Sequence, residues 1–204
     1  MKSVLAIFIF FAVPHFARAT QILIVGDSHA FGPMGQELQA SLKARGHQVE
    51  RFAVIGSSSG NWLGPQKEIL SFNELINKFN PQQIVISLGT NDVFNVCDNK
   101  SFSTKDTEKL LTLIPPSKVC FWIGPPGYIS GKVINKCGKN YNKFVDQLKF
   151  KVATRCQFID TRQAIDMMLQ EKNLEKDTVH LNALGGKRWS NFILKIMNST
   201  QEEK

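Results

Sequence analysis

The chain has 204 residues, with 25 Lys and Arg against 17 Asp and Glu, and a formal net charge of +8. Its lysines are scattered along the sequence and form no basic stripe or RNA-binding signature, which argues against nucleic acid as a partner. A mild positive charge favours an anionic environment such as a cell wall or lipid headgroups.

Residues 1–19 have the pattern of an export signal. Lys2 supplies a positive charge, residues 4–13 are apolar, and Ala17-Arg18-Ala19 has the A-x-A form of a cleavage site. The apolar stretch is shorter than the roughly 20 residues that a membrane-spanning helix needs. We therefore predict a signal peptide over 1–19 and a mature chain, 20–204, that forms a single domain. The chain would be exported, periplasmic or secreted, without membrane insertion after cleavage; an uncleaved anchor is the alternative.

After residue 19, short apolar runs alternate with helical patterns. Such runs, bounded by turn residues, are typical of strands buried on both faces of a parallel sheet. The predicted strands cover 22–25, 49–55, 84–88, 119–123 and 156–160. The predicted helices cover 34–45, 66–79, 104–113, 139–152, 162–172 and 183–197. This alternation indicates an α/β protein with a five-stranded parallel sheet and right-handed crossovers.

Three predicted strands end in small, polar or glycine-rich turns. The turns are Gly26-Asp27-Ser28, Gly56-Ser57-Ser58 and Gly89-Thr90-Asn91-Asp92. In parallel sheets the carboxyl ends of the strands share one edge, where ligands bind, so we expect these turns to surround one crevice. Taken alone, Gly-Asp-Ser is equally compatible with simple turn chemistry.

A serine nucleophile needs a base to activate it. Beyond residue 19 the histidines are His29, His47 and His180. His47 falls between a helix end and a strand, where we expect it on the surface. His180 is the preferred base, because Asp177, three residues earlier, can return in a turn and hold its ring.

These segments resemble the four blocks of the SGNH (GDSL-type) hydrolases, in the family's order and over nearly the whole mature chain. The matching residues are Gly26-Asp27-Ser28, Gly56, Gly89-Thr90-Asn91-Asp92 and Asp177-x-x-His180. The segment from His180 to Gly186 also resembles the start of the family's last helix. The resemblance implies a three-layer α/β/α fold, the flavodoxin-like SGNH hydrolase fold, and a carboxylic ester hydrolase.

The resemblance also implies a role for each matching residue. Ser28 would attack the ester carbonyl, His180 would take the serine proton and pass it to the leaving alcohol, and Asp177 would orient the imidazole. A Ser-His pair without the carboxylate is the alternative.

The implied oxyanion hole consists of the N–H groups of Ser28 and Gly56 and the side-chain amide of Asn91. Gly60, one helical turn further on, is the alternative to Gly56. Asn91 as a simple turn residue is the alternative to a donor.

Four residues are candidates for substrate contact. His29 stands where the family's motif has leucine, and we expect it to be a structural or pocket-edge residue rather than a catalytic one. Three aromatic residues follow strand ends, where they could stack on a sugar or contact an acyl chain: Trp62, Phe94 and Tyr128. Local packing is the alternative for these rings.

The sequence has no long apolar insertion that could form a lid. Together with export and basic charge, this favours short-chain esters, above all acetyl esters on an envelope or environmental glycan, cleaved through an acyl-enzyme without metal or cofactor. The alternatives are a lipid-acyl esterase, lysophospholipase or thioesterase, and a catalytically silent glycan-binding domain.

Four cysteines would form disulfides after export. They form no C-x-x-C pattern, which argues against a zinc site. Cys120 and Cys156 each precede the end of a predicted strand by four residues, so level parallel neighbours would bring them within bridging distance. Cys97 and Cys137 fall in connections on the crevice side. We predict the pairs Cys97–Cys137 and Cys120–Cys156; buried free thiols are the alternative for the second pair.

Overall fold

The computed structural model describes residues 19–65, 69–97, 103–126, 140–162, 164, 173–175, 177 and 179–202, without the side chains of 94–97 and 200–202. The predicted signal peptide, except residue 19, and most of the predicted helix over 162–172 lie outside these residues.

Five parallel strands form one sheet in the order β2-β1-β3-β4-β5. The strands are β1 (Gln21–Gly26), β2 (Gln48–Ala53), β3 (Gln83–Ser87), β4 (Val119–Ile123) and β5 (Gln157–Ile159). The predicted parallel sheet is confirmed, with strand ends within two residues of those expected. The strand order changes direction at β1, and ligands bind beside such a switch point, at the carboxyl ends of the strands.

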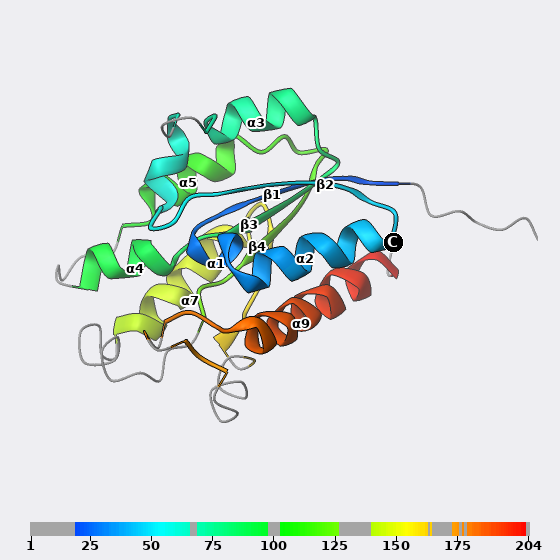
Figure 1. Cartoon of the computed structure of the whole chain (residues 1–204). Coiled ribbons are helices and arrows are strands. Elements are labelled where there is room, and N and C mark those ends of the chain that lie inside the picture. Colours follow the sequence, from blue (N-terminus) through cyan, green and yellow to red (C-terminus); the bar gives the residue numbers. More distant parts are fainter. Residues whose placement is uncertain are drawn as a thin grey trace, which may run out of the picture.

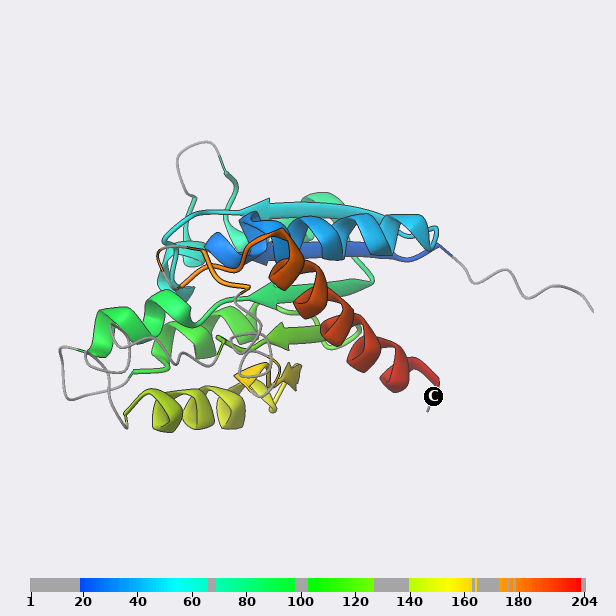
Figure 2. The same ribbon diagram turned by 60° about the horizontal axis from the view of Figure 1, so that its bottom comes forward.

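Helices cover both faces of the sheet (Figures 1 and 2). One layer contains α2 (Pro33–Ala44) and α9 (Ala183–Glu202), which lie side by side and pack on Ile22 and Ile24 of β1. The opposite layer contains α3 (Phe72–Phe79), α5 (Lys105–Thr112) and α7 (Asn140–Val152), which share a core with Leu23 and Val25. Because successive side chains of a strand point to opposite faces, one apolar strand serves both layers.

Three short helices begin inside the turns that follow β1, β2 and β3. These helices are α1 (Ser28–Phe31), η1 (Ser59–Leu63) and α4 (Thr90–Cys97). The sequence predicts only turns at these places, because the residues that favour turns also favour helix N-termini. In α1, for example, the Asp27 carboxylate accepts the His29 N–H at 2.9 Å and caps the helix.

Cys120 and Cys156 form a disulfide with a Cα–Cα distance of 4.6 Å. Phe121 pairs with Gln157 in the β4–β5 register, so the two cysteines occupy the preceding, level positions. The predicted pair is confirmed, and both residues are buried. Cys137 and the side chain of Cys97 lie outside the described residues, so that pairing stays a prediction.

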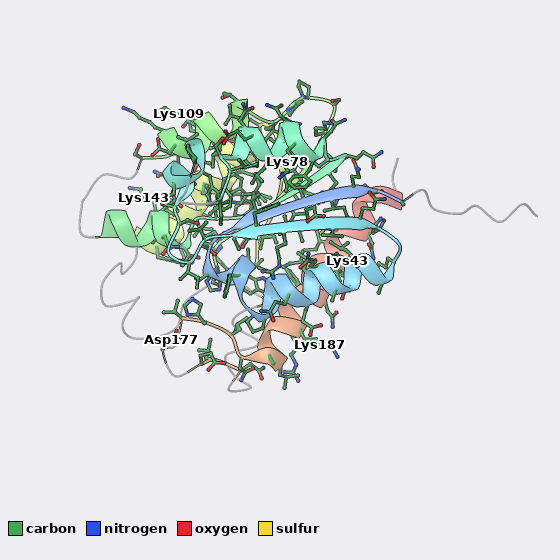
Figure 3. All side chains as sticks on the ribbon, turned by 45° about the horizontal axis from the view of Figure 1, so that its top comes forward. Lys43, Lys78, Lys109, Lys143, Asp177 and Lys187 are labelled. Atoms are coloured by element: carbon green, nitrogen blue, oxygen red, sulfur yellow. A yellow bond between two sulfur atoms is a disulfide. The ribbon has the colours of Figure 1, made fainter. Side chains whose placement is uncertain are left out.

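The surface lysines are distributed over the molecule. The lysines labelled in Figure 3 stand on five different helices: Lys43, Lys78, Lys109, Lys143 and Lys187. In the part of the chain that the structure describes, no helix has the length and apolar character needed to cross a membrane.

Candidate active site

The carboxyl end of β1 places Ser28 at the edge of the sheet. Glycine at position 26 allows this placement, because any larger residue would clash with its neighbours. A Cβ on Gly26 would lie 2.5 Å from the Ser87 carbonyl oxygen of β3 and 2.7 Å from the Cβ of Ala30. The Asp27 N–H then donates to the Ser87 carbonyl at 3.1 Å. Ser28 is the first residue of α1, and no acceptor among the described residues binds its N–H, as is usual for the first turn of a helix.

Ser28, His180 and Asp177 form a hydrogen-bonded chain. The Ser28 Oγ lies 2.8 Å from His180 Nε2, and His180 Nδ1 lies 2.5 Å from Asp177 Oδ2. The other oxygen of Asp177 accepts the N–H groups of Val179 and His180, both at 2.9 Å. This arrangement matches a Ser-His-Asp triad, in which the carboxylate fixes the tautomer and orientation of the imidazole.

Asp177 is ionised at neutral pH. Partial burial acts to raise its pKa, but the hydrogen bonds from the side chain and N–H of His180 and from the Val179 N–H lower the pKa to about 2. A carboxylate that stays ionised can stabilise the imidazolium that forms when His180 takes a proton.

The backbone around His180 is held by the segment that precedes α9. The His180 carbonyl accepts the Glu175 N–H at 2.8 Å, and the Asn182 N–H donates to the Asn173 carbonyl at 3.0 Å. The Asn182 side chain accepts the Gly185 N–H at 3.0 Å and so caps the first turn of α9. These bonds fix the approach of His180 to Ser28.

The turns after β2 and β3 are bound to each other beside Ser28. The Asn91 amide donates to the Ser57 carbonyl at 2.9 Å, and the Asp92 carboxylate accepts the Ser59 N–H at 3.0 and 3.1 Å. The amide of Asn91 has a second N–H that can be donated to a ligand. Gly56 has a φ of +78°, which favours glycine, and its N–H has no acceptor among the described residues.

Gly60 faces a different part of the molecule. A Cβ at Gly60 would lie 2.7 Å from the Asp106 carboxylate of α5, so this glycine allows η1 to pack on α5. The geometry therefore favours Gly56 over Gly60 as an anion donor.

The buried Asp27 and the partly buried Asp92 are two acids at these turns whose pKa values are raised. Burial raises the pKa of Asp27 to about 7, the His29 N–H opposes the shift, and the nearby Asp92 carboxylate adds to it. The Thr90 side chain favours the charged form, yet no hydrogen bond of normal geometry from the described residues reaches Asp27 Oδ2. Burial also raises the pKa of Asp92, against the opposing Ser59 N–H.

The structure corrects the substrate contact predicted for Trp62 and, for His29, supports a structural residue over a pocket-edge one. Trp62 is fully buried and its Nε1 donates to Ser57 Oγ at 3.1 Å, so it supports the turn after β2 from within the core. His29 is only 5% exposed and packs inside, against His180 and Trp189. Aromatic rings that follow strand ends can pack inward as well as outward, and here the core receives both. Tyr128 and the side chain of Phe94 lie outside the described residues.

Exposed apolar side chains stand on the three segments that carry the candidate residues. Phe31 follows Ser28 by one turn of α1, Ile55 precedes Gly56, and Leu184 lies on the first turn of α9 after His180. Their exposed fractions are 49%, 65% and 52%. Each of these side chains offers apolar surface on a segment that carries a candidate residue.

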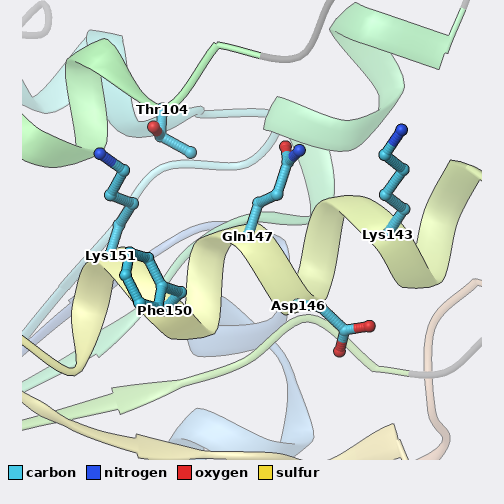
Figure 4. Close-up of a pocket in the computed structure, with 6 residues that line it drawn as sticks. All are labelled: Thr104, Lys143, Asp146, Gln147, Phe150 and Lys151. Atoms are coloured by element: carbon cyan, nitrogen blue, oxygen red, sulfur yellow. The ribbon is translucent and has the colours of Figure 1, made fainter.

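A groove of about 710 Å³ lies elsewhere, along α7. Its lining comes from α7 and the residue before α5, and includes none of the candidate catalytic residues (Figure 4): Thr104, Lys143, Asp146, Gln147, Phe150 and Lys151. The candidate active site is therefore assigned from the hydrogen-bonded series Ser28, His180 and Asp177, and not from this groove.

Residues 22–193 match the GDSL-like lipase/acylhydrolase family. No curated protein matches the sequence.

Among solved structures, an acetylxylan esterase from Geobacillus stearothermophilus is 20% identical, with a TM-score of 0.64 over 86% of this chain and 93% of that one. A lipase/acylhydrolase from Enterococcus faecalis is 19% identical, with a TM-score of 0.68 and coverages of 88% and 96%. The C-terminal catalytic domain of peptidoglycan O-acetyltransferase A from Streptococcus pneumoniae is 19% identical, with a TM-score of 0.60 and coverages of 90% and 96%. These likenesses show the flavodoxin-like fold of SGNH hydrolases.

Proposed function

Because the chain belongs to the GDSL-like lipase/acylhydrolase family, and is thus a carboxylic ester hydrolase, we propose that it removes short acyl groups, above all acetyl groups, from glycans. The observation that carries the proposal is the hydrogen-bonded series Ser28, His180, Asp177 at the carboxyl edge of the sheet. Such a series activates a serine hydroxyl for attack on an ester carbonyl.

In the proposed first half-reaction, Ser28 Oγ attacks the carbonyl carbon while His180 Nε2 takes the hydroxyl proton. The resulting oxyanion receives hydrogen bonds from the N–H groups of Ser28 and Gly56 and from the Asn91 amide. The bond to the alcohol oxygen then breaks, His180 donates its proton to that oxygen, and Ser28 carries the acyl group.

In the second half-reaction a water molecule replaces the alcohol. His180 takes a proton from the water as it attacks the acyl carbon, and the ester bond to Ser28 breaks as the proton returns to the serine oxygen. Asp177 stays ionised throughout and stabilises the transient imidazolium.

Three observations support glycan-linked acetyl esters as the substrate class. The names of two structures with this fold describe an acetylxylan esterase and a peptidoglycan O-acetyltransferase. The positive charge of the chain suits an anionic envelope. The signal-like residues 1–19 would direct the enzyme to the periplasm or outside the cell, where such glycans occur.

The test compares turnover of an aryl acetate, acetylated xylan and O-acetylated peptidoglycan by residues 20–204 and by variants. Ser28→Ala and His180→Ala should each lose activity by roughly 10⁴-fold or more at unchanged Tm, and the double variant should be scarcely worse. The matched controls are Ser117→Ala and His47→Ala, which should keep the wild-type rate. Most of the wild-type turnover in folded Ser28→Ala would overturn the mechanism. Glycan binding without turnover of any ester would instead indicate a silent binding domain.

The exposed apolar side chains of Phe31, Ile55 and Leu184 support one second candidate, hydrolysis of lipid-like acyl esters. An apolar acyl site gains ~0.8 kcal/mol per buried methylene, or roughly fourfold in rate for each added carbon. Rates on soluble esters that climb steadily from acetate to octanoate would therefore favour the lipid-acyl candidate. Rates that fall beyond acetate would support the glycan acetylesterase.

A further inference from the structure

The residue after the nucleophile lies against the candidate base. The ring centroids of His29 and His180 are 5.3 Å apart, with the ring planes inclined at 47°. His29 also contacts Trp189 of α9, edge-on, with ring centroids 5.2 Å apart. Trp189 is fully buried, so His29 connects the base to a rigid part of the core.

The hydrogen bonds of His180 to the described residues do not by themselves prevent its ring from tilting. Its hydrogen bonds to Ser28 and Asp177 engage the two ring nitrogens and fix positions along one line, but the ring can still tilt about that line. The side chains of His180 and Asp177 are 37% and 49% exposed, so water borders the outer part of the triad. The contact with His29 supplies a restraint on the buried side.

We propose that His29 is a positioning residue: its buried ring, backed by Trp189, holds the His180 imidazole in line with Ser28. The inference rests on the proposed esterase function, because it assigns His29 a part in the action of that base. His29 takes no proton and touches no substrate in this role.

The charge state of His29 is consistent with a positioning role. Burial, and after it the neighbouring His180, lower the pKa of His29 to about 3, while Asp177 acts weakly in the opposite direction. His29 is therefore neutral wherever an esterase is assayed. When His180 takes the Ser28 proton, the His29 ring therefore adds no second positive charge beside it.

The experiment measures kcat and KM for an aryl acetate in His29→Ala and His29→Phe. A misplacement of about 1 Å can cost ~100-fold in rate, so we expect kcat of His29→Ala to fall by roughly 10- to 100-fold with little change in KM. His29→Phe, which restores an aromatic support, should regain most of that loss. The control Leu42→Ala opens a cavity in the same core layer at the far end of α2; it should lower stability but keep kcat.

A second measurement separates positioning from general damage. In a His180→Ala background, His29→Ala should cause no further loss, because a residue that acts through His180 has nothing left to position. An equal loss in both backgrounds would overturn the proposal, as would wild-type kcat in folded His29→Ala or an effect confined to KM.

The remaining outcomes are also distinguishable. Should His29→Ala fail to fold, His29→Leu replaces it, since leucine fills much of the space without a planar ring; kcat equal to that of His29→Phe would then contradict the proposal. Activity in Ser28→Ala would defeat the proposed function itself. An inactive Ser28→Ala beside a fully active His29→Ala would defeat only this inference.

Discussion

The Cys120–Cys156 disulfide joins the amino ends of β4 and β5, at the edge of the sheet opposite Ser28. We predict that replacing both cysteines with alanine lowers the free energy of unfolding by about 4 kcal/mol. Because the bridge is remote from the catalytic edge, kcat/KM for an aryl acetate should stay at the wild-type value while the protein is folded.

The magnitude follows from the length of the loop that the bridge closes. The two cysteines are 36 residues apart in the sequence. In the chain-entropy account, a crosslink over this length removes roughly 13 cal/mol/K from the unfolded chain, or about 4 kcal/mol at room temperature. For a protein of this size, that corresponds to a fall in Tm of about 8–16 °C. Both cysteines are buried, so small cavities would add to the loss.

The assay is urea unfolding followed by tryptophan fluorescence, without reductant, so that Cys97 and Cys137 keep their own state. Single Cys120→Ala loses the same bridge and serves as a matched variant, which should show most of the same loss. A change below about 1 kcal/mol with an unchanged m-value would refute the entropic reasoning. Loss of activity in the folded double variant would show that the bridge is coupled to the catalytic edge.

Four further predictions follow from the site and the sequence. Asn91→Ala should lower kcat by ~100-fold or more with little change in KM, because an oxyanion donor acts as charge develops; a rise in KM alone would assign Asn91 to substrate positioning. Asp177→Asn should lower kcat by roughly 10²- to 10⁴-fold, and near wild-type turnover would instead indicate a Ser-His pair. Asp27 has a folded pKa of about 7, above the ordinary carboxyl value, so its contribution to stability is present below about pH 4 and is lost as pH rises to 7. The Tm of Asp27→Asn should therefore fall less than that of wild type between about pH 5 and pH 8; parallel declines would show that Asp27 ionises normally. Mass mapping of non-reduced peptides should find Cys97 joined to Cys137, and a Cys97–Cys120 link would contradict the pairing.

Much of the sheet could be predicted, because each strand is indicated by a short stretch of the sequence. Runs such as Ile22 to Val25 are short, apolar at every position and followed by turn residues, which is typical of a strand covered on both faces. The level positions of Cys120 and Cys156 follow from counting back along two such strands. The meeting of Ser28 with Asp177 and His180 was predicted in part from the shared edge of a parallel sheet and in part from the family resemblance.

The predictions failed where tertiary packing decides the outcome. A serine or asparagine after a strand is equally suited to a turn and to the first residue of a helix, so α1 and α4 were missed. The burial of Trp62 depends on its partner Ser57, and the burial of His29 depends on the ring remaining neutral. Asp27, two residues before the capped His29 N–H, is the signal that could have indicated α1.

The hydrogen bond between Ser28 and His180 spans 152 residues of sequence and joins α1, which follows the first strand, to the segment ahead of α9. If Ser28 and His180 act together as proposed, catalysis depends on the docking of α9 against α2. An opening confined to α9 would silence the enzyme while the sheet and its disulfide stay intact, since local openings need less free energy than global unfolding. On gradual heating, hydrolysis should therefore cease before the circular dichroism of the sheet is lost. The esterase activity of this protein would then measure whether α9 is docked.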